Sequence, residues 1–226
     1  MSDQKQGARK TRVWDLPVRA FHWVLVLLVV SQIVTVSIGG NAMDYHVLGG
    51  YAILALVTFR IAWGFLGTST ARFANFLGGP RTALHYAKSL LSATPERAAG
   101  HNPLGGWSVI AMLVSILVQA VSGLFADDDI MTTGPLNKYV SNDTASVFNV
   151  IHETNAVVLL TLICIHLGAI LFYLLRKKEN LVKPMFTGNK LLGSNATDSL
   201  RPFEGTLRAL IILAVCAAAT WVVVTY

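Results

Sequence analysis

Histidine side chains are the first candidates for chemistry, because four of the six lie within or at the ends of long apolar stretches. The four are His22, His46, His152 and His166. Ionisable side chains are costly in apolar segments of this length and usually serve a function there. Neutral imidazole is a strong ligand for metal ions such as iron, so these side chains are candidate metal ligands.

The spacing of His152 and His166 places both side chains on nearly the same face of one helix. They are 14 residues apart, which at about 100° per residue is roughly 40° short of four whole turns. The axial rise between them is about 21 Å, and the apolar core of a membrane is about 30 Å thick. One histidine of this helix is therefore expected near each surface of the membrane.

The elements that position these residues are expected to be membrane-spanning helices. The chain is 54% hydrophobic and only 13% charged, with a mean hydropathy of +0.55, whereas a soluble domain carries about 25% charged residues. A spanning helix needs roughly 18–20 apolar residues. Stretches of about this length occur at residues 21–38, 46–66, 107–126, 150–175 and 207–224. The sequence therefore predicts an all-helical membrane protein with a four-helix bundle and a fifth, C-terminal spanning helix.

Lysine and arginine are concentrated in alternate connections between these stretches. They crowd the N-terminal segment and the connections at residues 67–106 and 176–206. The other connections hold one basic residue, Lys138, and five acidic ones: Asp44, Asp127, Asp128, Asp129 and Asp143. By the positive-inside rule, the N-terminus is expected in the cytoplasm and the C-terminus in the periplasm. The net charge of +6 then reflects membrane topology, and no nucleic-acid partner is expected.

Depth in the membrane pairs His22 with His166 near the cytoplasmic face and His46 with His152 near the outer face. Two histidine pairs at matched depths suit bis-histidine ligation of two haems b between the helices of a bundle. The haems are expected to be non-covalent, because the chain has no Cys-x-x-Cys-His motif. Zinc is the alternative metal for these histidines, but a zinc site would need three or four ligands at one depth.

Two arginines and a glycine fit the haem hypothesis. Arg19 precedes His22 by three residues, and Arg60 follows His46 by 14 residues, at the level of the cytoplasmic pair. A buried arginine needs an anionic partner, which haem propionates would provide. Alternatively, Arg19 is an interfacial topology charge and Arg60 extends its charge to the membrane surface. Gly50 removes side-chain bulk where a flat ring would lie close to the backbone.

Short strings around these residues resemble bacterial di-haem cytochromes b. They are Val13-Trp14-Asp15-Leu16-Pro17-Val18-Arg19-Ala20-Phe21-His22-Trp23, His46-x-x-Gly49-Gly50-Tyr51, Phe59-Arg60-x-x-Trp63-Gly64, His101-Asn102-Pro103-Leu104-Gly105, His152-Glu153, His166, Glu179-Asn180-Leu181-Val182 and Met185-Phe186-Thr187-Gly188. The sequence resembles the cytochrome b561 type, especially the cytochrome b subunit of nickel-iron hydrogenases, over about residues 12–190. This divides the chain into a di-haem bundle at residues 1–190 and a linker with the fifth helix at residues 191–226.

The resemblance implies electron transfer between a periplasmic redox partner and the quinone pool of a bacterial inner membrane. The partner would be a hydrogenase, a cytochrome c or another protein. Related subunits bind quinone near the cytoplasmic haem, which implicates His166, His101 and Asn102; the last two can instead form a helix cap before Pro103. Two other functions stay open, a self-sufficient superoxide:quinone oxidoreductase and a haem-containing membrane anchor for an enzyme. Membrane lipid is a further expected partner, and a homo-oligomer is left open.

Three segments lie outside the expected four-helix bundle. Residues 80–92 predict a short amphipathic helix on the cytoplasmic surface. The acidic connection at residues 126–149 either steers a basic cytochrome c or is simply solvated. The fifth helix departs from the four-helix members of the family, and we expect it to pack in lipid rather than bind a partner.

Overall fold

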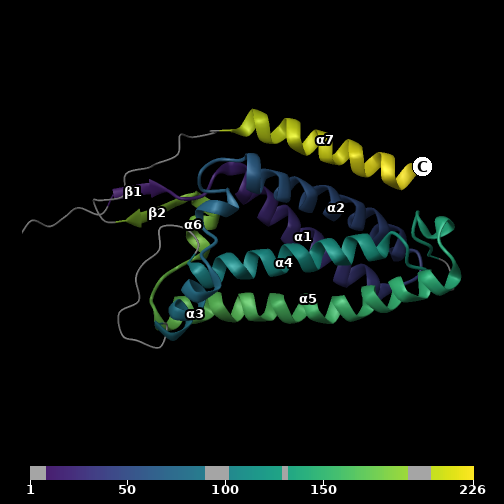
Figure 1. Cartoon of the computed structure of the whole chain (residues 1–226), viewed down its shortest axis with the longest axis horizontal. Helices are drawn as coiled ribbons and strands as arrows, with labels where there is room; N and C mark the ends of the chain where they lie inside the picture. The colour runs from purple at the N-terminus through teal and green to yellow at the C-terminus, as the bar shows by residue number, and fades with distance from the viewer. Residues whose placement is uncertain (1–8, 90–101, 129–131, 193–204) are drawn as a thin grey trace, which may run out of the picture.

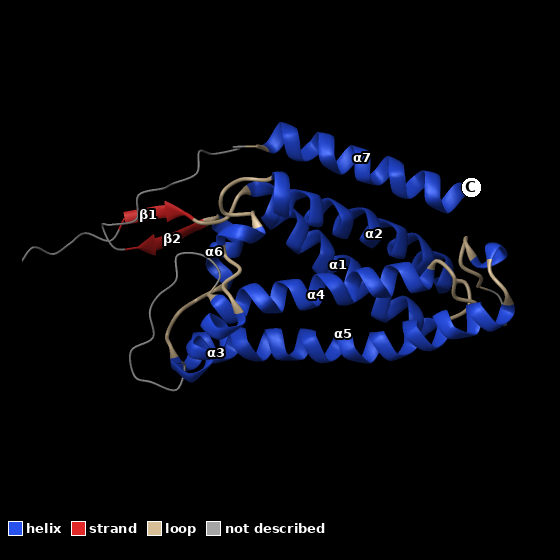
Figure 2. Cartoon of the chain, viewed as in Figure 1, coloured by secondary structure: helices blue, strands red, loops and turns tan. Residues whose placement is uncertain are grey.

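The computed structural model describes residues 9–89, 102–128, 132–192 and 205–226 and is almost entirely helical (Figures 1 and 2). Within these residues, five helices are long and apolar enough to cross a membrane. They are α1 (Leu16–Ile38), α2 (Ala42–Leu66), α4 (Pro103–Gly123), α5 (Asn142–Arg176) and α7 (Thr206–Thr225). The predicted fold class is confirmed, and each predicted span overlaps one of these helices.

Local capping explains where three of the helices begin. The Asp15 side chain accepts a hydrogen bond from the backbone N–H of Val18 and caps α1. Asn102 caps α4 in the same way through Gly105, and Ser141 caps α5 through Thr144. Such caps satisfy backbone donors that have no partner within the helix. They also start α4 and α5 several residues before the apolar stretches that predicted them.

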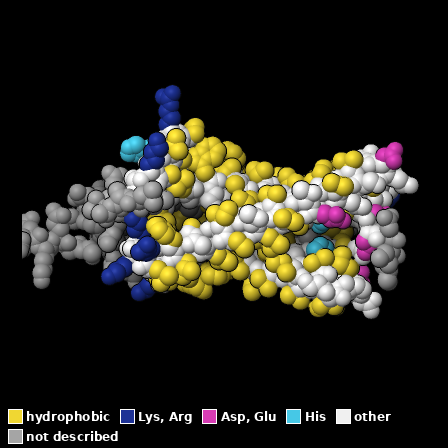
Figure 3. All heavy atoms as spheres, turned by 90° about the horizontal axis from the view of Figure 1, so that it is seen from below, with side chains coloured by type: hydrophobic (Ala, Val, Ile, Leu, Met, Phe, Trp, Pro, Cys, Tyr) yellow, Lys and Arg dark blue, Asp and Glu magenta, His cyan; other side chains and the backbone are white. Residues whose placement is uncertain are grey.

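The helices pack as two close pairs, α1 with α2 and α4 with α5, which are joined by contacts between α2 and α4. Helix α7 lies along α2 on the outside of this bundle (Figure 1). Val57 and Trp63 of α2 are fully buried at the centre of the core, whereas apolar side chains such as Leu27 remain exposed on the periphery. Apolar side chains cover the middle of the face in Figure 3, as expected of a surface that contacts lipid.

The two ends of the bundle are built differently. At one end a small antiparallel sheet pairs β1 (Arg9–Arg12) with β2 (Asn189–Leu192). This end also holds the short helices α3 (Pro80–Ser89) and α6 (Val182–Thr187) and the 3-10 turn η1 (Phe73–Asn75). We call it the hairpin end after its two antiparallel strands, although they are far apart in the sequence. The opposite, loop end carries the turn between α1 and α2 and the connection from α4 to α5, which contains η2 (Asn137–Tyr139).

Two features differ from the sequence-based expectations. The sheet was not predicted, because neither four-residue strand alternates apolar and polar side chains. The surface helix occurs as α3, but only Ala83 of its expected apolar side is buried, and Leu84 is exposed. Residues 90–92 of the predicted helix lie outside the described residues.

Candidate functional site

His46 of α2 and His152 of α5 lie side by side near the loop end. Their ring centres are 6.4 Å apart and the ring planes are inclined by 76°. A metal–imidazole bond is about 2.0 Å long and the bonded nitrogen lies about 1.1 Å from the ring centre, so two imidazoles on opposite sides of one metal have centres about 6.3 Å apart. The separation would therefore allow both imidazoles to bind one metal ion. Figure 3 shows histidine side chains in a hollow between the helices towards this end.

The hydrogen bonds of this pair determine which ring nitrogen is available. His46 Nδ1 lies 3.3 Å from the backbone oxygen of Gln32 in α1, and His152 Nδ1 lies 3.0 Å from that of Gln119 in α4. A carbonyl oxygen only accepts hydrogen bonds, so both Nδ1 atoms carry the proton. The Nε2 atom of each ring keeps its lone pair and can bind a metal.

The second pair, His22 of α1 and His166 of α5, belongs to the hairpin end. The two rings are close enough to interact electrostatically. His22 also meets the Trp23 ring edge-on, with ring centres 4.9 Å apart. Its Nδ1 atom is buried and has no hydrogen-bond partner among the described residues.

Arg19 and Arg60 both carry a buried nitrogen that lacks a partner within the described part of the chain. Arg19 also donates to the backbone oxygen of Phe186 in α6. Arg60 is 3% exposed, and its guanidinium lies 4.9 Å above the Phe73 ring. Unsatisfied buried donors need an explanation, and those of these two arginines fit an acidic group such as a haem propionate.

The Asp15 carboxylate lies near Arg60 and is an anion within the chain itself. Asp15 was not identified as a site residue from the sequence. This carboxylate is 3% exposed and interacts electrostatically with Arg60. Its Oδ2 atom accepts hydrogen bonds from Trp63 Nε1 at 2.9 Å and Thr68 Oγ1 at 2.6 Å. The sequence signal that could have identified Asp15 was its position in the segment that resembles di-haem cytochromes b. Arg60 therefore has a partial counter-charge within the chain, and its contact with a propionate stays a prediction.

Glycines leave different kinds of space beside the histidines. A Cβ atom added to Gly50 or Gly168 would meet nothing within 4 Å, so both positions border open space, and Gly168 is exposed. A Cβ atom at Gly123 would lie 3.0 Å from Cε1 of His152. Gly123 therefore lets the imidazole, and not a cofactor, approach α4.

Asn102 has two hydrogen-bonding roles at the hairpin end. Its Oδ1 atom accepts from Gly105 N at 2.7 Å, and its Nδ2 atom donates to the Tyr173 hydroxyl at 2.8 Å. The Tyr86 hydroxyl of α3 lies 2.9 Å from the same Tyr173 hydroxyl. Asn102 is thus a helix cap, one of the alternatives considered, and also joins α4 to α5. His101 lies outside the described residues.

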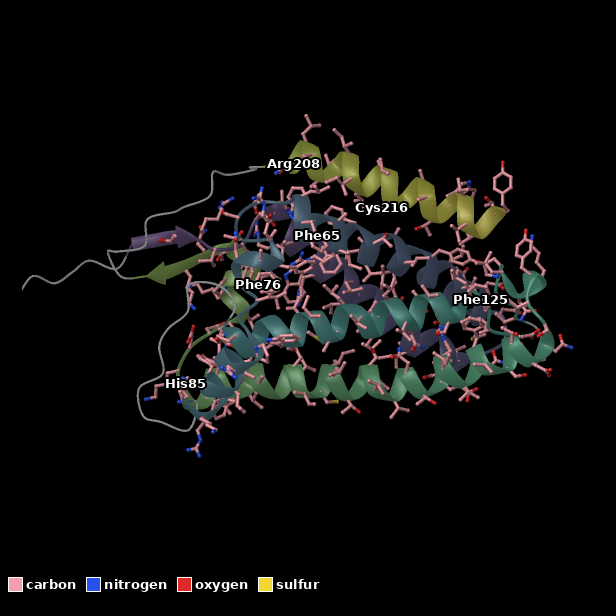
Figure 4. The ribbon with its side chains drawn as sticks, viewed as in Figure 1. Phe65, Phe76, His85, Phe125, Arg208 and Cys216 are labelled. Atoms are coloured by element: carbon pink, nitrogen blue, oxygen red, sulfur yellow. The ribbon has the colours of Figure 1, made fainter. Side chains whose placement is uncertain are left out.

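The remaining candidate ligands do not gather at one place. Within the described residues, histidine, cysteine and acidic side chains form no group of three or more that could hold a metal ion. His85 lies on α3 at the hairpin end (Figure 4). Both cysteines, Cys164 and Cys216, are free.

Comparison with known proteins places the chain in a family. Residues 13–188 match the family described as prokaryotic cytochrome b561. A probable Ni/Fe-hydrogenase B-type cytochrome subunit of Azotobacter vinelandii is 30% identical over 135 residues, which cover 48% of this chain and 54% of the relative. The corresponding protein of Azotobacter chroococcum mcd 1 is 29% identical over the same shares. The chain thus spans about half the length of these curated relatives.

No solved structure matches the chain significantly. The family match, however, covers well over half of the sequence and includes all four membrane histidines. It also agrees with the five apolar helices. The chain therefore belongs to the prokaryotic cytochrome b561 family and is a multi-pass membrane protein.

Proposed function

We propose that this protein carries electrons across the membrane through two haems b, each held by one histidine pair. The observation that carries the proposal is the placement of His46 and His152, with ring centres 6.4 Å apart and both Nδ1 atoms hydrogen-bonded to backbone oxygens. When bound, the haems supply reversible one-electron chemistry at iron. The protein contributes ligands, a low-dielectric surrounding and a fixed distance between the two centres.

At the hairpin end the proposed ligands are His22 and His166, and Arg19 and Arg60 would bind the propionates of the haem. On three of these four side chains a buried nitrogen has no partner within the described part of the chain, which supports this assignment, because an acidic cofactor would satisfy the arginines. Helix α6 closes this end: Phe186 stacks on Trp23 with ring centres 4.2 Å apart. The stack and the Arg19 bond to Phe186 would shield the site from water.

The proposed electron donor or acceptor at the loop end is a periplasmic protein. The printed names of the two relatives favour a nickel-iron hydrogenase. The acidic loop end, with Asp44 and Asp143, also offers an electrostatic surface for a basic cytochrome c. Quinone is proposed as the partner at the hairpin end, near His166 and Asn102.

Two other functions receive less support. Superoxide is an anion, and the acidic loop end would repel it, which disfavours a superoxide:quinone oxidoreductase. A membrane anchor with haem as a structural part would not need two histidine pairs near opposite ends of one bundle. Electron transfer between the haems distinguishes conduction from anchoring.

The test is a haem count on the purified full-length protein and its histidine variants. We expect two b-type haems in the wild type and one after His46→Ala, His152→Ala, His22→Ala or His166→Ala. The double variant His46→Ala/His152→Ala should still keep one haem, because both residues serve the same iron. His85→Ala is the matched control and should keep two. Two haems in the His46→Ala protein would refute the ligand scheme.

A further inference from the structure

The two histidines of the loop-end pair have the same kinds of hydrogen-bond partner, on two different helices. His46 Nδ1 lies 3.3 Å from the backbone oxygen of Gln32 and 3.4 Å from the Thr35 hydroxyl. His152 Nδ1 lies 3.0 Å from the backbone oxygen of Gln119 and 3.1 Å from the Ser122 hydroxyl. Both helices therefore present a glutamine carbonyl and, three residues later, a hydroxyl. The two segments read Gln32-Ile33-Val34-Thr35 and Gln119-Ala120-Val121-Ser122.

The hydroxyl groups are oriented to accept from the imidazole. The Thr35 hydroxyl donates to the backbone oxygen of Ser31 at 2.8 Å, and the Ser122 hydroxyl donates to that of Gln119 at 3.2 Å. Their single protons are thus used, and their lone pairs face Nδ1–H. Each loop-end imidazole is consequently surrounded by two acceptors. We call each set of carbonyl and hydroxyl a Gln-hydroxyl clamp.

The surroundings of the two clamps are also equivalent in position. Three residues after His46, Gly49 leaves space that the Gln32 side chain occupies. Three residues after His152, Asn155 donates to Gln119 Oε1 at 2.6 Å and to the Ser115 backbone oxygen at 2.9 Å. In both cases the glutamine side chain therefore contacts the residue three positions after the histidine. The paired helices α1–α2 and α4–α5 repeat one arrangement with different side chains.

The hairpin-end pair lacks this arrangement at His22. The Nδ1 atom of His22 is buried and has no hydrogen-bond partner among the described residues. An acceptor on Nδ1–H makes Nε2 a stronger electron donor to its metal, and this favours the oxidised, more positive iron. Within the described residues, both loop-end ligands have two such acceptors and His22 has none, so we expect the two centres to differ in electron donation.

We infer that the two Gln-hydroxyl clamps position His46 and His152 as Nε2 ligands and make the loop-end haem the lower-potential centre. This inference rests on the proposed function. With both haems bound, one electron would move from the loop-end centre, which would be oxidised, to the hairpin-end centre, which would be reduced, and no bond would be made or broken. Electrons enter favourably from the loop end and leave at the hairpin end.

The experiment is a potentiometric titration of haem absorbance in the purified full-length protein. Thr35→Val, Ser122→Ala and their double variant remove the clamp hydroxyls but leave the carbonyls and all four histidines. Ser31→Ala is the matched control, because the Ser31 hydroxyl donates to Leu28 O of its own helix and, among the described residues, to neither imidazole. His46→Ala identifies which of the two reduction waves belongs to the loop end. Haem content is measured for every variant.

We expect His46→Ala to remove the lower-potential wave. The clamp variants should shift that wave upwards and leave the other wave and the control unchanged, with two haems per chain. If a clamp variant instead loses one haem, the surviving wave should be the higher one. The inference is overturned if His46→Ala removes the higher wave, if the higher wave shifts or disappears in a clamp variant, or if the double variant titrates as wild type. A wild-type protein without two haems would instead contradict the proposed function.

Discussion

At the scale of single residues, the Asp15 carboxylate joins three parts of the hairpin end. Its Oδ1 atom accepts from Val18 N at 2.8 Å, and its Oδ2 atom accepts from Trp63 and Thr68. One side chain therefore caps α1, fixes the end of α2 and orders the turn that follows α2. Hydrogen bonds to a buried charge are stronger than neutral ones, and a partly satisfied network is costly.

Replacing Asp15 with alanine is expected to destabilise the protein strongly. Three buried donors would lose their acceptor, and each unsatisfied donor costs about 1–3 kcal/mol. We expect a loss of at least about 3 kcal/mol in the free energy of unfolding, with a smaller loss for Asp15→Asn, which keeps one acceptor. Thermal unfolding in detergent, followed by circular dichroism and haem absorbance, measures the change.

Asp44→Ala is the control for this prediction. Asp15 is the N-cap of α1, and Asp44 is an acidic residue in the first turn of α2, but Asp44 is exposed at the loop end. Its removal should change the unfolding temperature little, because a surface charge near a helix N-terminus contributes less than about 1 kcal/mol. Equal destabilisation by both variants would show that the Asp15 network is not what stabilises the hairpin end.

At the scale of helices and strands, sequence patterns predicted the spans but not the contacts between them. Apolar length indicates a spanning helix wherever it occurs, so all five were predicted. The 14-residue interval of His152 and His166 needed only the pitch of a helix. The bonds from imidazole Nδ1 to Gln32 and Gln119 could not be predicted, because a backbone oxygen carries no sequence signal and the neighbouring helix was unknown.

The β1–β2 sheet was missed for a related reason. Its register pairs Arg12 with Asn189, residues that lie far apart in the sequence. Pairing at this separation depends on the bundle, since four spanning helices return the chain to the end where it began. The Asp15–Trp63 bond was likewise hidden, because a lone acidic residue before a helix predicts only a cap.

Helix α7 is attached to α2 more closely than a helix that simply lies in lipid. Ala209 is 4% exposed against α2 and Thr220 is buried. The Arg208 guanidinium lies 5.4 Å above the Trp63 ring, and Figure 4 shows Arg208 at the hairpin-end start of this helix. Small residues allow close approach of helices in membranes, where packing drives association.

Ala209→Leu is therefore expected to loosen α7 from α2. Three added carbon atoms have no space at a buried contact, and overpacking typically costs about 1–3 kcal/mol. Ala217→Leu, at an exposed position of the same helix, makes the same chemical change without the contact. Limited proteolysis before residue 206 and thermal unfolding measure the effect. Equal behaviour of the two variants would contradict tight packing of α7, whereas haem content should not change in either.

At the scale of the whole molecule, charge is sorted between the two ends. Lysine and arginine gather at the hairpin end and acidic residues at the loop end (Figure 3). The apolar surface between them separates these two groups of charges. Basic residues remain on the cytoplasmic side when helices insert, so the hairpin end is expected in the cytoplasm and the loop end in the periplasm. The final helix reaches the loop end, where the Tyr139 hydroxyl donates to the backbone oxygen of Tyr226.

This topology predicts the result of reporter fusions in a bacterial host. A phosphatase that folds only in the periplasm should be active when fused after Tyr226 or inserted beside Lys138. It should be inactive when fused after Lys178, at the hairpin end, where a cytoplasmic fluorescent reporter should be bright. A bright fluorescent reporter at the same position shows that an inactive phosphatase fusion is not due to poor expression. An active phosphatase after Lys178 would reverse the orientation and move the His46–His152 pair to the cytoplasmic side. Because electrons are inferred to enter at the loop end, that result would also place their source in the cytoplasm.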